Sequence, residues 1–186
     1  MKKLSQLEKT AYHEAGHATA RYFLKIPFRY VTIKSEKDSY GHTLGYPIPK
    51  AFVNDRDNSP RMRMRIEKYI MAHYAGHTAE CILTGRSNWK GADHDISNAL
   101  DLATRLTGSN EQASAFLKWM WIRTINLIKN PLRWIAVEAL AKELLIKNKI
   151  KAKEARHIIE QTLESKGIRT SIPTRKLSIR KRQKNP

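Results

Sequence analysis

The chain has 186 residues, of which 41% are hydrophobic and 28% charged, and its formal net charge is +18. This size and composition are typical of one folded domain with a single core, which excludes a largely disordered protein. Neither an apolar membrane span nor a signal-peptide core is present, so we expect a cytoplasmic protein, and Cys81 as the single cysteine excludes an intramolecular disulfide.

The first predicted helix begins at Ser5 and ends near Leu24. Ser5 and Glu8 match a capping box, in which each side chain accepts a hydrogen bond from the other residue's backbone N–H. Small and apolar side chains then recur at helical spacing until Pro27 prevents continuation. The sequence therefore predicts an N-terminal helix of about five turns.

Two short strands follow, at residues 30–33 and 43–46, around a polar turn at 35–41. β-branched and aromatic residues in these runs predict a hairpin or the edge of a small sheet. A segment rich in Pro, Asn and Asp, residues 47–59, predicts an exposed loop before the next helix.

The rest of the domain is predicted to be helical. Good N-cap residues precede proline at Ser59-Pro60 and again at Asn130-Pro131, where the second pair divides an apolar segment into two helices. We expect the tryptophans on either side of this division to lie in the core. The predicted ranges are about 60–85, 93–107, two helices flanking residue 130, and 151–166.

His13, Glu14 and His17 match the pattern HExxH within the first predicted helix. A helix turns about 100° per residue, so the two His side chains lie about 40° apart and both can reach one metal ion. Glu14 projects about 60° from His17, which suits it to hold a water molecule as a general base rather than to bind the metal. The pattern predicts a zinc peptidase site.

A zinc site of this kind needs a third protein ligand and an open fourth position. Asp93 and Asp95 lie at the start of the third predicted helix, where the backbone N–H groups favour an ionised carboxylate. Spacing alone does not choose between the two residues.

At these positions the sequence resembles the peptidase domain of the FtsH-type metalloproteases. Residues 10–18, TAYHEAGHA, resemble the zinc motif of that family, and residues 91–96 with Ala99 resemble its GAxxD[LI]xxA segment, whose Asp is the third zinc ligand. The resemblance selects Asp95 and implies Zn²⁺ held by His13, His17 and Asp95. It extends over roughly residues 8–162, including two substrate-side strands, an AEE helix at Ala79-Glu80 and a closing helical segment at 139–159.

The resemblance implies a mainly α-helical zincin-like fold with a small β-sheet (α+β), closed by a C-terminal helical segment. It also implies a metalloendopeptidase that hydrolyses peptide bonds in unfolded or exposed segments, with Glu14 as the base and an extended substrate against residues 43–46. We expect this domain to span residues 1–168.

The sequence departs from the family pattern in three ways. Twelve residues precede His13, so we expect no ATPase module in this chain and an activity that is independent of ATP within it. Cys81 replaces the second Glu of AEE, and His77 stands where Arg is common. A separate ATPase and further copies of the chain are therefore candidate partners.

The sequence offers two other assignments within the site. His73 and His77 have the i, i+4 spacing of a metal pair, but Tyr74 replaces the Glu that a hydrolytic site needs, so a second metal site is the less favoured alternative. Glu80 is an alternative zinc ligand in place of Asp95, although we favour a structural or orienting role for it.

Residues 169–186 contain seven basic residues, no acidic residue and few apolar ones. This composition predicts a disordered tail that solubilises the protein or contacts nucleic acid or an anionic membrane surface. The rival functional hypothesis is a catalytically silent peptidase-fold protein that acts through its basic surface as a nucleic-acid-associated or adaptor protein.

Overall fold

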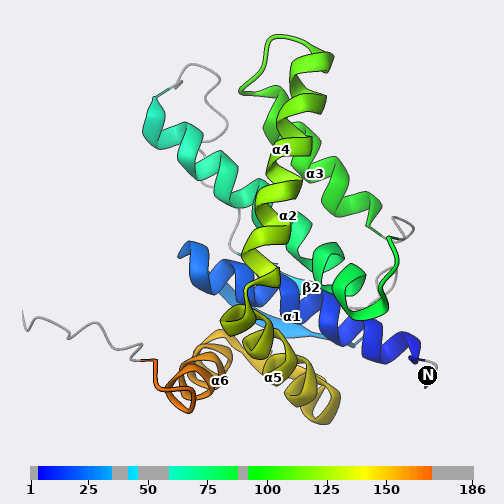
Figure 1. Cartoon of the computed structure of the whole chain (residues 1–186), viewed down its shortest axis with the longest axis vertical. Helices are drawn as coiled ribbons and strands as arrows, with labels where there is room; N and C mark the ends of the chain where they lie inside the picture. The colour runs from blue at the N-terminus through cyan, green and yellow to red at the C-terminus, as the bar shows by residue number, and fades with distance from the viewer. Residues whose placement is uncertain (1–3, 35–41, 46–58, 88–91, 169–186) are drawn as a thin grey trace, which may run out of the picture.

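The computed structural model describes residues 4–34, 42–45, 59–87 and 92–168, and these form a mainly α-helical fold with one small β-sheet, as predicted (Figure 1). The elements in chain order are α1 (Gln6–Leu24), β1 (Phe28–Thr32), β2 (His42–Gly45), α2 (Pro60–Thr84), α3 (Asp93–Thr104), α4 (Asn110–Lys129), α5 (Pro131–Lys147), β3 (Lys149–Lys151) and α6 (Ala152–Glu164).

The ends of the first helices follow from local hydrogen bonds that the sequence predicts. Ser5 Oγ accepts from Glu8 N at 3.1 Å and Glu8 Oε2 accepts from Ser5 N at 2.7 Å, which completes the capping box of α1. The α2 helix begins after Ser59, whose Oγ accepts from Met62 N at 3.2 Å, and ends at Gly85, where φ is 67°. The predicted starts of α1 and α2 are confirmed.

The three strands form an antiparallel sheet in the order β2-β1-β3. Val31 in the central strand pairs with Thr43 of β2 on one side and with Ile150 of β3 on the other. The sequence does not predict β3, because its three residues contain one buried apolar side chain and lie between two long helices. Thr32 Oγ1 donates to the carbonyl oxygen of Asn148 at 3.0 Å, which links β1 to the residue directly before β3.

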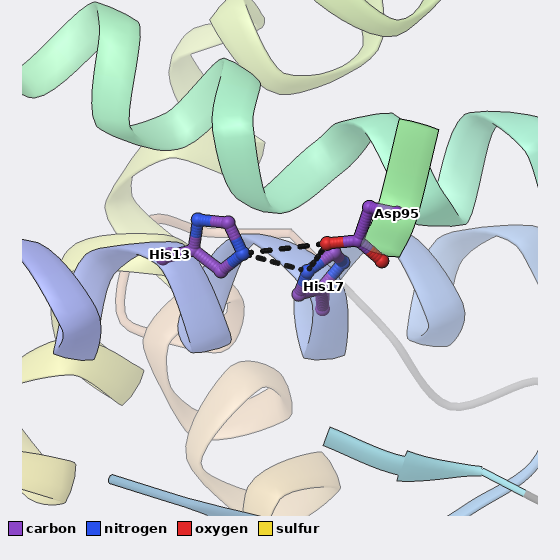
Figure 2. A group of neighbouring side chains, drawn as sticks. All are labelled: His13, His17 and Asp95. Carbon is purple, nitrogen blue, oxygen red and sulfur yellow. Dashed lines mark hydrogen bonds and ion pairs between the residues drawn. The ribbon is translucent and has the colours of Figure 1, made fainter. Parts of the chain in front are cut away.

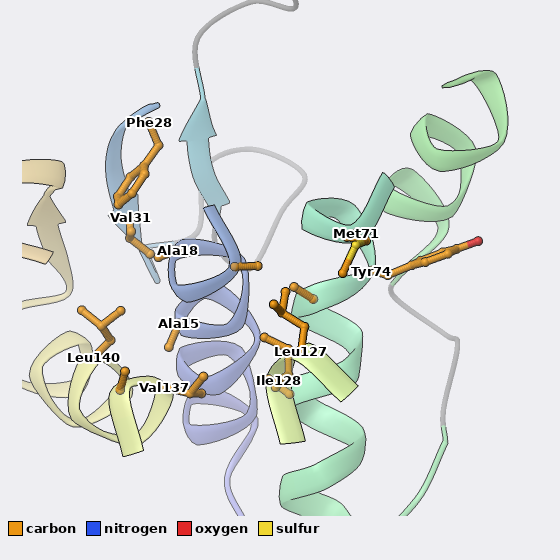
Figure 3. Packing of buried hydrophobic residues seen from close by; sticks show 14 of the residues in the cluster. Ala15, Ala18, Phe28, Val31, Met71, Tyr74, Leu127, Ile128, Val137 and Leu140 are labelled. Atoms are coloured by element: carbon orange, nitrogen blue, oxygen red, sulfur yellow. The ribbon is translucent and has the colours of Figure 1, made fainter. Parts of the chain in front are cut away.

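Helix α1 lies at the centre of the molecule and packs against α2 and α5 (Figure 1). The side chains on its buried face are small, because Ala15 and Ala18 are fully buried there, and both neighbouring helices therefore approach closely. Figure 3 shows Val137 and Leu140 on one side of α1 and Met71 on the other. The close packing of α1 on α2 fixes where the HExxH residues lie relative to α2.

The expectation that all the tryptophans of this region lie in the core is wrong for Trp119. Its side chain is 48% exposed, whereas Trp121 and Trp134 are partly buried against the core. Arg123 lies over the Trp119 ring at 4.7 Å from its centroid, so a cation rather than the core covers one ring face.

None of the helices in the described residues is both long and apolar enough to cross a membrane. The predicted turn at 35–41, the loop at 47–58 and the basic tail at 169–186 lie outside the described residues. The domain boundary at residue 168 and the disorder of the tail therefore stay predictions.

Candidate metal centre

The two His residues of HExxH lie one helical turn apart on α1 and turn their rings toward the same point (Figure 2). The Nε2 atoms of His13 and His17 are 3.1 Å apart. His17 Nδ1 lies 2.7 Å from the backbone carbonyl oxygen of Ala72 on α2, to which it donates a hydrogen bond. This bond fixes the orientation of the His17 ring and turns its Nε2 atom toward His13.

Asp95 reaches the His pair from the first turn of α3 (Figure 2). Its Oδ2 is 3.0 Å from Nε2 of His17 and 3.5 Å from Nε2 of His13. Asp93, two residues earlier in the same turn, is exposed. The structure thus brings Asp95 and the two His residues into one cluster, whereas spacing alone does not choose between Asp93 and Asp95.

The separations within this cluster fit a tetrahedral zinc ion. Zinc bonds of about 2.0–2.1 Å place tetrahedral ligand atoms about 3.3 Å apart. The three measured separations, 3.0, 3.1 and 3.5 Å, bracket that value. Two imidazoles and one carboxylate are a donor set that zinc accepts, and three protein ligands leave a fourth position open. The residues present therefore fit Zn²⁺.

The electrostatics of the cluster also favour a cation. Burial raises the pKa of Asp95, but the charge of His17 and hydrogen bonds with His13, His17 and His73 outweigh burial and lower it overall. Burial lowers the pKa of His13, but hydrogen bonds to Asp95 and Glu80 outweigh it and raise the pKa of His13 to about 10. An ionised carboxylate thus stabilises positive charge at the His pair, where a bound metal ion would lie.

Gly76 on α2 allows the helix backbone to pass directly beside the imidazole rings. A Cβ atom at this position would lie 2.3 Å from Nε2 of His17 and 2.6 Å from Nε2 of His13. These distances are far inside van der Waals contact, so any side chain at residue 76 would displace the rings. The glycine keeps the space at the nitrogen atoms clear.

Glu14 is buried, with 4% of its surface exposed, and follows His13 on α1. Thr43 of β2 donates through Oγ1 to Glu14 Oε2 at 2.9 Å and also lies 3.2 Å from the backbone carbonyl oxygen of Glu14. No sequence motif singles out Thr43 as a partner of Glu14. Its contact joins residues 29 positions apart and follows from the packing of β2 on α1.

Glu80 lies behind His13 rather than within the cluster. Its Oε2 is 3.6 Å from Nδ1 of His13, on the ring side opposite Nε2. Among the described residues, the group able to hold a metal ion comprises His13, His17 and Asp95 without Glu80. This position suits an orienting role for Glu80, which the sequence favours over a role as ligand.

His73 and His77 have different hydrogen-bond partners. His73 Nδ1 lies 3.1 Å from Asp95 Oδ1, whereas His77 Nε2 lies 3.3 Å from Cys81 Sγ and its ring packs on Trp121. Burial lowers the pKa of His77. Residue spacing along α2 does not predict the contact of His73 with Asp95, because it carries no information on α3.

Comparisons with known proteins agree with the motifs. No protein-family model matches the chain. The ATP-dependent zinc metalloprotease YME1L1 of Mus musculus is 28% identical over 188 residues, which cover 92% of this chain and 25% of the relative. The Homo sapiens protein of the same name is also 28% identical, and the alignment covers 92% of this chain and 23% of that relative. The ATP-dependent zinc metalloprotease FtsH of Haemophilus influenzae is 34% identical over 104 residues, or 54% of this chain and 15% of the relative.

The chain therefore spans about a quarter of the length of the YME1L1 proteins that it matches. Its aligned part covers nearly all of the chain. The motifs and the alignments agree that the chain is similar to the peptidase region of the FtsH-type zinc metalloproteases.

Proposed function

We propose that this chain is a zinc-dependent metalloendopeptidase that hydrolyses peptide bonds in unfolded or exposed protein segments. The observation that carries the proposal is the convergence of His13, His17 and Asp95 at separations of 3.0–3.5 Å, with the buried carboxylate of Glu14 on the same helix. A structural zinc site needs no general base, whereas a hydrolytic site does.

His13, His17 and Asp95 would hold the ion through two Nε2 atoms and Oδ2. Zn²⁺ bound there supplies Lewis-acid chemistry, which acidifies water and polarises the scissile carbonyl group. The carboxylate of Glu14 accepts a proton from the attacking water and then donates it to the leaving amine. Oε2 of Glu14 accepts the hydrogen bond from Thr43, so we assign the proton transfer to Oε1.

The substrate would lie extended along the outer edge of β2. In the described residues β2 is an edge strand, because β1 pairs with it on one side and β3 lies beyond β1. Thr43 of β2 contacts Glu14, so this edge runs beside the proposed base. Strand addition recognises the peptide backbone, which suits an enzyme that accepts many sequences in an unfolded conformation.

The relatives are named as ATP-dependent enzymes, but we assign the hydrolytic step alone to the described residues. A separate ATPase that delivers unfolded segments, and further copies of this chain, are the partners that we propose to test. Neither is required for the proton transfer that Glu14 performs.

The variant Glu14→Gln tests the mechanism. The amide keeps the shape of the side chain but does not accept the proton, so we expect zinc content to stay at about one ion per chain while casein cleavage is lost. Zinc is measured by atomic absorption and cleavage by release of labelled peptides. Glu111→Gln, an exposed change on α4, serves as the matched control.

Two outcomes would contradict this proposal. Undiminished casein cleavage by Glu14→Gln would exclude Glu14 as the base. Failure of the zinc-loaded wild-type protein to cleave any unfolded substrate would favour the rival hypothesis of a silent peptidase fold that binds nucleic acid or acts as an adaptor.

A further inference from the structure

The carboxylate of Asp95 is engaged on both of its oxygen atoms. Oδ2 faces the Nε2 atoms of His13 and His17, whereas Oδ1 lies 3.1 Å from Nδ1 of His73. The His73 side chain is 14% exposed and that of Asp95 is 20% exposed, so the contact is largely shielded from water. Shielding strengthens a hydrogen bond to an ionised carboxylate.

We propose that His73 is a positioning residue that orients Asp95 as the third ligand of the proposed zinc site. Its Nδ1–H donates to Oδ1 and prevents the carboxylate from rotating, so that Oδ2 stays directed at the His pair. The neutral Nδ1–H tautomer and the imidazolium ion both donate this hydrogen bond, so the role does not depend on a change of protonation. The inference rests on the proposed zinc-dependent function.

The arrangement around the other two ligands supports this role. His17 Nδ1 donates to the carbonyl oxygen of Ala72, and His13 Nδ1 faces Glu80 Oε2 at 3.6 Å. Ala72, His73 and Glu80 all belong to α2, so this one helix faces the side of each ligand that points away from the cluster. Partners that orient metal ligands in this way typically raise metal affinity by about 10–100-fold.

His73 is not itself placed as a ligand. Among the described residues, the group able to hold a metal ion comprises the three residues on α1 and α3, and Nδ1 of His73 contacts Oδ1 of Asp95, whereas Oδ2 faces the His pair. Oδ1 is engaged by His73, and Oδ2 is the oxygen that faces the His pair. The geometry therefore favours one-oxygen ligation by Asp95.

The test compares two substitutions of His73 that differ in where they place a donor. His73→Asn puts its amide N–H group close to the position of Nδ1, whereas His73→Gln puts it near the position of Nε2. We expect His73→Gln and His73→Ala to weaken zinc binding by about 10–100-fold and His73→Asn to restore most of the affinity. His94, the exposed neighbour of Asp95, provides the control. We expect His94→Ala to bind zinc with wild-type affinity.

Zinc affinity is measured on the full chain by competition with a fluorescent chelator, with circular dichroism of the metal-free proteins as the folding control. The absorption spectrum of the Co²⁺-loaded proteins reports ligand geometry, and we expect it to change in His73→Gln and to be wild-type in His73→Asn. Because Asn and Gln carry the same functional group, their difference is informative even if His73→Ala fails to fold.

The outcomes separate this inference from the proposed function. Wild-type zinc affinity in folded His73→Gln, or equal weakening by Asn and Gln, would overturn the positioning role and leave the zinc site intact. Absence of zinc binding in the wild-type protein would overturn both.

Discussion

At the scale of single residues, Thr43 is the side chain that links the sheet to the proposed base. Its hydroxyl group donates to the buried carboxylate of Glu14 at 2.9 Å. Hydrogen bonds to charged groups contribute about 1.5–3 kcal/mol, and about 1.4 kcal/mol corresponds to a tenfold change in rate. We infer that Thr43 holds Glu14 in the conformation that transfers the proton.

Replacing Thr43 by Val removes the hydroxyl group and keeps the shape. We expect kcat for an unfolded peptide substrate to fall about 10-fold with little change in KM, because orientation of the base matters in the transition state. Thr162→Val, which removes a hydroxyl group on α6 that donates to Ile158, is the matched control. A wild-type kcat in Thr43→Val would show that Glu14 is oriented without this contact.

At the scale of elements, the close approach of α1 and α2 builds the candidate site. Two glycines make the approach possible, one on each helix. A Cβ at Gly16 would lie 2.5 Å from the carbonyl oxygen of Ala75, and a Cβ at Gly76 would lie 2.3 Å from Nε2 of His17. The first glycine therefore controls helix packing, and the second controls the space at the clustered His nitrogens.

The variant Gly76→Ala separates metal binding from folding. Alanine favours a helix interior by about 0.5–1 kcal/mol over glycine, which offsets part of the strain, so we expect the helical content of α2 to be kept. The added methyl group displaces both imidazoles, so zinc affinity should fall by at least about 10-fold, as is typical when residues that orient metal ligands are lost.

Chelator competition and circular dichroism measure the two effects. Gly108→Ala is the control, because its Cβ would lie 3.5 Å from Oε1 of Gln112, an ordinary van der Waals contact. Unchanged zinc affinity in Gly76→Ala would show that the rings can move aside without losing the ion.

At the scale of the whole molecule, the net charge of +18 predicts attraction to polyanions. Residues 169–186 hold seven of the basic residues and lie beyond the last segment that resembles the peptidase family, so the remaining chain still carries 18 − 7 = +11. We propose that the tail binds anionic surfaces and takes no part in hydrolysis.

Removing residues 169–186 should leave peptide hydrolysis intact and weaken binding to DNA or to vesicles with anionic lipid. The affinity of the full chain should fall steeply as salt rises, because released counterions and screening govern such contacts. Fluorescence anisotropy with labelled DNA and vesicle sedimentation measure the two kinds of binding. Equal binding by both proteins at every salt concentration would leave the tail a solubilising extension, and loss of hydrolysis in a folded truncation would move the domain boundary.

The sequence by itself determined the helices and the first two metal candidates. The capping signals at Ser5, Ser59 and Asn130 act through hydrogen bonds within one helical turn, so they can be recognised in short stretches of sequence. The i, i+4 spacing of His13 and His17 likewise fixes their shared face as soon as the helix forms. The resemblance to a known family then selected Asp95 over Asp93.

The tertiary structure decided the features that depend on contacts between elements. The strand β3 forms because its residues lie beside β1, and its own three residues carry too short a pattern to predict it. The contact of His73 with Asp95 spans 22 positions and that of Thr43 with Glu14 spans 29. The first arises from the packing of α3 against α2 and the second from the packing of β2 against α1, and no local hydrogen bond or periodicity encodes either.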